Sequence, residues 1–189
     1  MFLLSKKAAV LLLMAAASLG TLNAQAASAT SSEAPAQKVS MLGGKFTFNL
    51  PKGFIANPLP ASPSGASGTM YSNSTTKTVV IAAENSLPAG VKVKDNDGAF
   101  LDGTLADFDT SQRKALPDYN KLSEKSLTQK GTGLGIRQID GTAKQGGGMT
   151  LNSTLIAASG TRMAVVQIIS RPADMAAHET LIKQIVSGK

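Results

Sequence analysis

The residue types that carry most enzyme chemistry are scarce in this sequence. Its 189 residues include one histidine, His178, and no cysteine. Zinc sites need several thiolate or imidazole ligands, so we expect no zinc site, and a cysteine nucleophile is excluded. The G-x-S-x-G elbow of serine hydrolases is absent, and the nearest string, Gly65–Gly68, lies in a Pro/Ser-rich stretch. We interpret His178, in the apolar stripe of a predicted terminal helix, as a residue at the edge of the core.

Acidic residues gather between positions 95 and 109. Asp95–Gly98 resembles half of an EF-hand loop. If Gly98 is the loop glycine, the first ligand position falls on Val93 and the bidentate glutamate position on Thr104, and neither residue can serve. We therefore predict a solvated turn and the N-terminal cap of a helix. An irregular weak cation site stays open as the alternative, because three further carboxylates follow: Asp102, Asp107 and Asp109.

Two glycine-rich strings do not match nucleotide-binding loops. In Gly131–Gly135 the spacing of the dinucleotide fingerprint fails, since Ile136 stands at the third glycine position. Gly43-Gly44-Lys45 is followed by Phe46, where a P-loop needs serine or threonine. We predict that these glycines occupy turns, and we expect no cofactor, no metal and no catalytic residue. A pair of carboxylates that meets only in the folded chain is the enzyme alternative that linear sequence leaves open.

The first 26 residues have the pattern of a secretory signal peptide. Lys6 and Lys7 precede an apolar run over residues 8–19, and Ala24-Gln25-Ala26 provides small residues for a peptidase. We predict cleavage between Ala26 and Ala27. The run is shorter than the roughly 20 residues that a membrane span needs, so we expect no stable transmembrane segment after cleavage. Without a cysteine at the cleavage point we also expect no lipid anchor, and hence a periplasmic or secreted protein.

The remaining 163 residues suffice for one domain with a hydrophobic core. Residues 27–39 are small, polar and Pro-containing, which indicates a flexible leader, and residues 40–189 are predicted to form the domain. Loss of Lys6 and Lys7 lowers the net charge from +7 to +5. The lysines are scattered and the chain has no tryptophan and two tyrosines. We therefore expect no nucleic-acid partner, since such sites interleave basic and aromatic residues.

Hydrophobic periodicity predicts an α+β fold with an antiparallel sheet flanked by helices. Residues 57–68, with three prolines and two glycines, are predicted to form a loop. Asp95–Gly98 starts one helix and Pro117 stops it, whereas Pro172 and Asp174 open a second helix that Gly188 closes. Ser159-Gly160 joins two long strands in a hairpin. The predicted strands are residues 45–50, a short one at Tyr71, 78–83, 120–128, 136–143, 149–158 and 161–170.

Residues 42–51, Leu-Gly-Gly-Lys-Phe-Thr-Phe-Asn-Leu-Pro, resemble the opening strand of the DcrB family of enterobacterial envelope proteins. The similarity continues in order through Tyr71–Ile81, the helix that begins at Ala99, Arg137–Asp140 and Gln167–Asp174. It spans nearly all of residues 40–187. The resemblance implies a PsbP-like domain and a link to phage entry and envelope homeostasis, with no catalytic residues to transfer. DcrB itself resembles an inner-membrane lipoprotein, whereas this chain has alanine where the lipidated cysteine would stand.

Three functions are compatible with this sequence. The first is a non-enzymatic periplasmic protein that binds an envelope protein or lipid and supports envelope homeostasis, stress fitness, host colonisation or virulence. The second is a binder of anionic lipid, polyanion or a small ligand that uses exposed lysines such as Lys121, Lys125 and Lys130. The third is a cryptic hydrolase that depends on His178.

Overall fold

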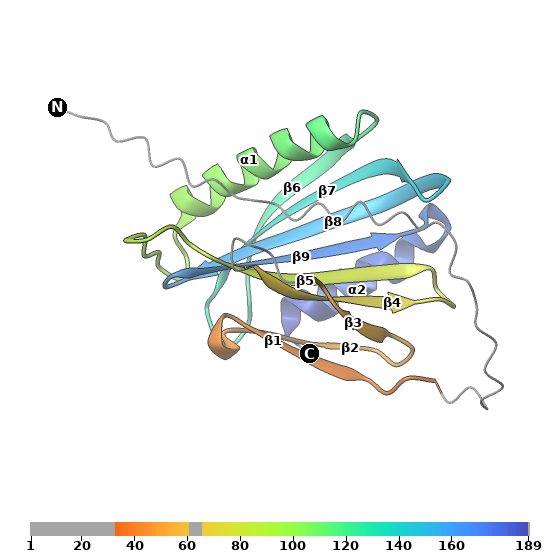
Figure 1. Cartoon of the computed structure of the whole chain (residues 1–189), viewed down its shortest axis with the longest axis horizontal. Helices are drawn as coiled ribbons and strands as arrows, with labels where there is room; N and C mark the ends of the chain where they lie inside the picture. The colour runs from red at the N-terminus through yellow and green to blue at the C-terminus, as the bar shows by residue number, and fades with distance from the viewer. Residues whose placement is uncertain (1–32, 61–65, 189) are drawn as a thin grey trace.

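The computed structural model describes residues 33–60 and 66–188. The predicted signal peptide and its cleavage point at Ala26 and Ala27 lie outside the described residues. The described part is an α+β domain in which an antiparallel sheet separates two helices (Figure 1). None of its helices is long and apolar enough to cross a membrane.

The first half of the domain contributes five strands. β1 (Gln37–Met41) and β2 (Phe46–Leu50) form a two-stranded hairpin joined by the short 3-10 turn η1 (Leu42–Gly44). β3 (Ile55–Pro58), β4 (Ser67–Asn73) and β5 (Thr78–Ser86) then form one half of the large sheet. The alternation of Phe46, Phe48 and Leu50 explains β2, since all three side chains are buried while Asn49 is exposed.

The second half supplies the other four strands of the large sheet. β6 (Asn120–Thr128), β7 (Gly135–Gln145), β8 (Gly148–Ser159) and β9 (Arg162–Ser170) pair in succession. The spatial order β3-β4-β5-β9-β8-β7-β6 places β5 beside β9. Most side chains of the central strands β5, β8 and β9 are buried because both of their faces are covered.

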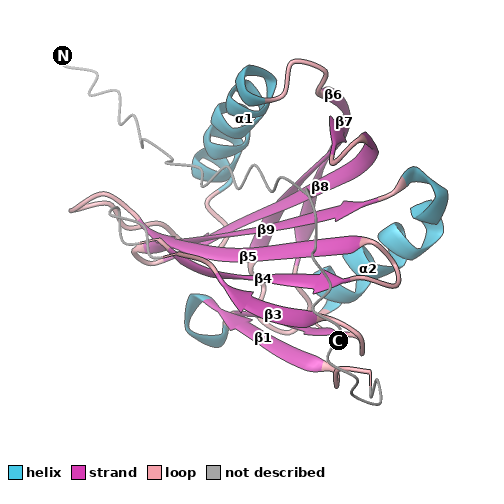
Figure 2. Cartoon of the chain, turned by 45° about the vertical axis from the view of Figure 1, so that its right-hand side comes forward, coloured by secondary structure: helices cyan, strands magenta, loops and turns pink. Residues whose placement is uncertain are grey.

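The two helices cover opposite faces of this sheet (Figure 2). α1 (Gly98–Ala115) packs on β7 and β8, whereas α2 (Met175–Ser187), preceded by the 3-10 turn η2 (Pro172–Asp174), packs on β2, β8 and β9. One core cluster lies between the sheet, α2 and the β1–β2 hairpin, and a smaller one lies under α1. Gly188 ends α2 in the left-handed region, with φ 72°, as a helix-closing glycine does.

The N-terminal cap of α1 confirms the turn predicted at Asp95–Gly98. The Asp97 carboxylate accepts a hydrogen bond of 3.1 Å from the backbone amide of Phe100. We expect Asp97→Ala to lower the free energy of unfolding by about 1 kcal/mol, because a helix amide loses its acceptor. Urea denaturation measures the change. Asp107→Ala, on an exposed turn of the same helix, is the control and is expected to change stability by less than about 0.5 kcal/mol.

Three details differ from the sequence-based expectations. β1 begins at Gln37, inside the stretch 27–39 predicted as a flexible leader, because Val39 and Met41 are buried against the domain. β3 and β4 enter both ends of the loop predicted over 57–68, although Pro58 ends β3 at the edge of the sheet. Five strands, not two or three, therefore precede α1. The strands from 120 onward, the Ser159-Gly160 hairpin and both helices are confirmed.

Candidate functional site

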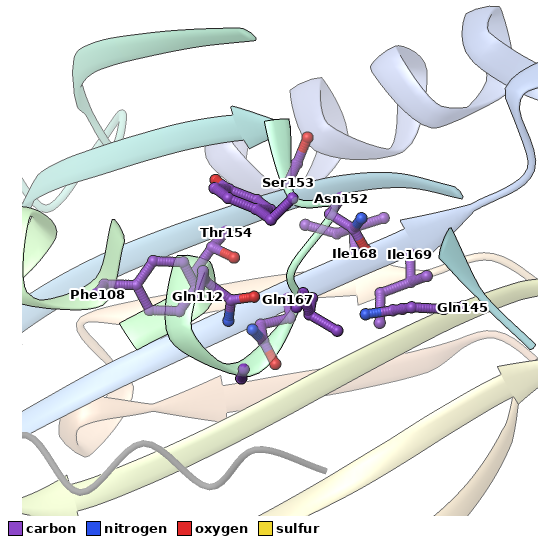
Figure 3. A pocket seen from close by; sticks show the side chains of 12 residues that line it. Phe108, Gln112, Gln145, Asn152, Ser153, Thr154, Gln167, Ile168 and Ile169 are labelled. Atoms are coloured by element: carbon purple, nitrogen blue, oxygen red, sulfur yellow. The ribbon is translucent and has the colours of Figure 1, made fainter. Parts of the chain in front are cut away.

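A small cleft lies between α1 and the sheet. Figure 3 shows the polar ends of Gln112, Thr154 and Gln167 gathered there beside Phe108. Its volume is about 70 Å³. Ligand sites usually measure roughly 300–1,000 Å³, so this cleft has room for a few water molecules only.

A larger groove lies on the other face of the sheet, between α2 and the strands β6 and β7. Its volume is about 390 Å³, which is in the range of small-molecule sites. We call it the α2 groove. Its walls are formed by Lys125, Leu127, Thr128, Lys130, Gln138, Glu179, Ile182, Lys183, Val186 and Ser187.

The α2 groove has an apolar floor and a charged rim. Ile182 is buried in the core under α2, and the partly buried Leu127 and Val186 pack against that core. The Lys183 side chain is 79% exposed and that of Lys125 is 55% exposed. Lysine side chains of this kind keep the ammonium group in water while their methylene stems line apolar surface.

A hydrogen-bonded chain of polar side chains, from Gln138 through Asp140 and Ser153 to His178 and Ser170, runs from this groove into the domain. Gln138, a wall residue, donates from Nε2 to Asp140 at 2.7 and 2.9 Å. Asp140 also accepts bonds of 2.6 Å from Ser123 and Ser153. The Lys125 ammonium lies 3.4 Å from the same carboxylate. Asp140 thus ties two residues of the groove to the sheet beneath.

His178 continues this chain. Its Nε2 lies 2.9 Å from the Ser153 hydroxyl and its Nδ1 lies 2.9 Å from the Ser170 hydroxyl. Because the Ser153 proton is donated to Asp140, Nε2 must carry the ring proton and donate to Ser153. Nδ1 then accepts from Ser170. With His178 neutral, both ring nitrogens and the hydroxyl groups of Ser153 and Ser170 therefore have hydrogen-bond partners.

The surroundings move the pKa values of both ionisable members of the chain. Burial raises the pKa of Asp140, but the hydrogen bonds from Ser123, Ser153 and Gln138 and the charge of Lys125 outweigh burial, so the net shift is downward. Burial lowers the pKa of His178, against the opposing charges of Asp140 and Glu179. At neutral pH we therefore expect an ionised Asp140 and a neutral His178.

This geometry does not match a nucleophile and its base. In a catalytic triad the serine donates to histidine and the histidine donates to the carboxylate. Here Ser153 donates to Asp140 directly, and Ser153, Ser170 and His178 are all buried. His178 is deeper than the core-edge position expected from the sequence, since 5% of it is exposed.

The acidic residues near α1 are distributed among separate partners. Asp95 binds Lys45 at 2.7 Å and Ser159 at 2.6 Å, and the hydrogen bond from Lys45 is the main reason why its pKa is lowered. Asp102 pairs with Arg137, which lowers the pKa of that carboxyl too. Asp109 pairs with Arg113. Among residues 33–60 and 66–188, no three such side chains are grouped as a metal site requires.

The three lysines named from the sequence do not share one surface. Lys125 and Lys130 both line the α2 groove. Lys121 instead pairs with Glu124 at 2.8 Å and lies 3.9 Å from Asp109 of α1. Sequence reasoning missed that Lys183, Ile182 and Val186 line the same groove as Lys125 and Lys130. The apolar stripe of α2 was visible, but the strand that it faces depends on the order of the sheet.

Comparisons with known proteins complete this description. No family model and no curated protein matches the sequence. The solution structure of cyanobacterial PsbP (CyanoP) from Synechocystis sp. PCC 6803 covers 83% of this chain and 92% of its own, with a TM-score of 0.58 and 10% identity. The fold is PsbP-like.

Two further structures have TM-scores of 0.46 and 15% identity to this chain. One is a Pseudomonas aeruginosa protein of unknown function, which covers 79% of this chain and 92% of its own. The other is LpqN, involved in cell envelope biogenesis of Mycobacterium tuberculosis, and this match covers 80% of this chain and 87% of LpqN. The PsbP-like fold accounts for the sheet with a helix on each face, whereas the groove must be interpreted from its own residues.

Proposed function

We propose that this chain is an exported, DcrB-like protein without catalytic activity that binds a component of the cell envelope in its α2 groove. Cleavage between Ala26 and Ala27 releases it into the periplasm, or for secretion beyond it. The single observation that carries this proposal is the α2 groove, with its apolar floor and lysine rim.

Size and rigidity favour a binding role for this groove. Its volume of about 390 Å³ is sufficient for a small ligand, unlike that of the cleft under α1. The cavity on the other side of α2 is larger, at about 480 Å³, but has one lysine in its wall where the groove has three. The walls of the groove come mostly from a strand pair and a helix, which hold a binding surface more firmly than loops do, and Lys130 lies on the turn that follows β6. The polar chain behind it is satisfied within the domain, so Asp140 and His178 support the groove and are not needed to react with a ligand.

The resemblance to the DcrB family supplies the cellular setting of the proposal. A released member would act on envelope homeostasis, stress fitness or host colonisation by carrying or masking its partner. Because this chain has alanine in place of the lipidated cysteine, the phage-entry role of anchored relatives is not part of the proposal. Fractionation with intact mass of the mature protein tests release. A periplasmic species that starts at Ala27 is expected, and a membrane-bound species that retains residues 1–26 contradicts it.

Photocrosslinking in cells tests the groove itself. We expect a photoreactive phenylalanine analogue in place of Thr128, an exposed groove residue, to capture an envelope component in reproducible yield. The matched control replaces Thr110, an exposed threonine of α1 on the opposite face. Equal adduct patterns at the two positions, or none at Thr128, would contradict binding in the groove.

A further inference from the structure

The α2 groove also indicates what kind of ligand it accepts. We infer that the groove binds an anionic amphiphile with a single alkyl chain. In this arrangement the chain lies on Leu127, Ile182 and Val186, and the anionic headgroup lies among the lysines of the rim. The inference rests on the proposed function, since it names the ligand class of that same groove.

The apolar floor fits one hydrocarbon chain. Ile182 anchors the floor in the core, and Leu127 and Val186 extend it to the surface from opposite walls. A volume of about 390 Å³ accommodates a single chain but not the paired chains of a bilayer phospholipid. Each methylene group that leaves water adds favourable binding free energy, so the alkyl chain supplies most of the affinity.

The rim selects negative charge. Three lysines line the groove, Lys125, Lys130 and Lys183, with one carboxylate, Glu179. Asp140 contacts Lys125 from inside the domain, and Glu179 lies 3.9 Å from Lys183. Three ammonium groups therefore face two carboxylates. The carbonyl end of α2 adds partial negative charge, and the one positive charge left over from three lysines and two carboxylates outweighs it. An anionic headgroup complements this rim, whereas a cationic one would meet it with repulsion.

A second large cavity beside α2 does not carry the same argument. It lies on the opposite side of α2, has a volume of about 480 Å³ and includes His178, Ser170 and Phe54. Its charged wall residues are one lysine, Lys52, and one glutamate, Glu33. Because they cancel, charge complementarity selects no ligand class there.

Calorimetric titration of the mature protein tests the ligand class. The probes are decyl phosphate and decyl maltoside, both below their micelle-forming concentrations, and inorganic phosphate. We expect decyl phosphate to bind one to one, about ten-fold more tightly than the uncharged decyl maltoside, and inorganic phosphate alone to give no measurable heat. The double substitution Lys130→Gln and Lys183→Gln should weaken decyl phosphate about ten-fold and leave decyl maltoside unchanged.

The control removes the same charge elsewhere. Lys92→Gln with Lys114→Gln, both exposed residues outside the groove, should leave the affinity for decyl phosphate unchanged. Equal affinity for the charged and uncharged amphiphiles, or tight binding of inorganic phosphate alone, would overturn the inference. The inference would also be overturned if the double substitution Lys130→Gln and Lys183→Gln left the affinity for decyl phosphate unchanged. If crosslinking at Thr128 persists in any of these cases, the proposed function stands and only the ligand class is wrong. Absence of both decyl phosphate binding and the adduct at Thr128 contradicts the ligand class and the proposed function together.

Discussion

Asp140→Ala is expected to lower the free energy of unfolding by about 3 kcal/mol. The substitution removes the acceptor of three hydrogen bonds, from Ser123, Ser153 and Gln138. It also leaves Lys125 without its partner carboxylate. Removing one member of a partly buried network costs more than the pair contributes, because the remaining donors stay desolvated and unpaired.

Urea denaturation at neutral pH measures this loss, with the dependence on urea concentration expected to stay the same. The stability of Asp140→Asn should lie between those of wild type and Asp140→Ala. The amide keeps one acceptor oxygen, but its NH2 group replaces the other acceptor with a donor that faces the serine hydroxyl donors. Asp107→Ala, which removes an exposed carboxylate of α1, is the matched control. A loss below about 1 kcal/mol for Asp140→Ala would contradict the network described here.

The second large effect is a loss of stability on acidification between pH 7 and pH 5. His178 has a lowered pKa in the folded protein, whereas an unfolded histidine titrates near about 6.5. The unfolded chain therefore takes up a proton first as the pH falls. Stability must decrease from about pH 6.5 downward until the folded protein also binds the proton.

His178→Gln isolates this effect. Glutamine can donate to Ser153 and accept from Ser170, as neutral histidine does, but it does not titrate. No other histidine is present in the sequence, so the variant should lose most of its pH dependence between pH 7 and pH 5. Denaturation midpoints at pH 7, 6 and 5 measure it. The same slope in both proteins would show that His178 is not the group responsible.

Asp140 acts in a lower pH range. Its pKa is lowered in the folded protein, so its contribution is complete above the ordinary carboxyl range near about 3.9. That contribution is lost only as the pH falls further, through the folded pKa. The effects of His178 and Asp140 on stability are therefore separable along one titration.

The sequence predicted the elements whose signals are local. Asp97 caps α1, Gly188 ends α2, and Gly160, with φ 59°, turns the β8–β9 hairpin. In each case one residue type has a backbone or capping preference that the position requires. The short strands β1 and β3 were missed because five and four residues offer too little periodicity to outweigh neighbouring prolines and small polar residues.

The candidate site could be predicted in part. Lys125 and Lys130 were identified from composition, since exposed lysines in a basic chain suggest an anionic partner. Their grouping with Lys183 required the edge position of β6 and the crossing of α2 over that end of the sheet. His178 was interpreted from the sequence as a residue at the edge of the core. Its neutral state within the chain from Ser170 to Asp140 depends on β7, β8 and β9 meeting under α2.

The central claim is that the α2 groove is the binding surface of this protein. The methyl spectrum of the isotopically labelled mature protein, titrated with decyl phosphate and then decyl maltoside, tests it most directly. The account predicts saturable shifts of the Leu127, Ile182 and Val186 methyl signals, while those of Val165 and Met163 under α1 stay in place. Shifts confined to the α1 side would contradict it, as would the absence of shifts with either amphiphile together with the absence of an adduct at Thr128.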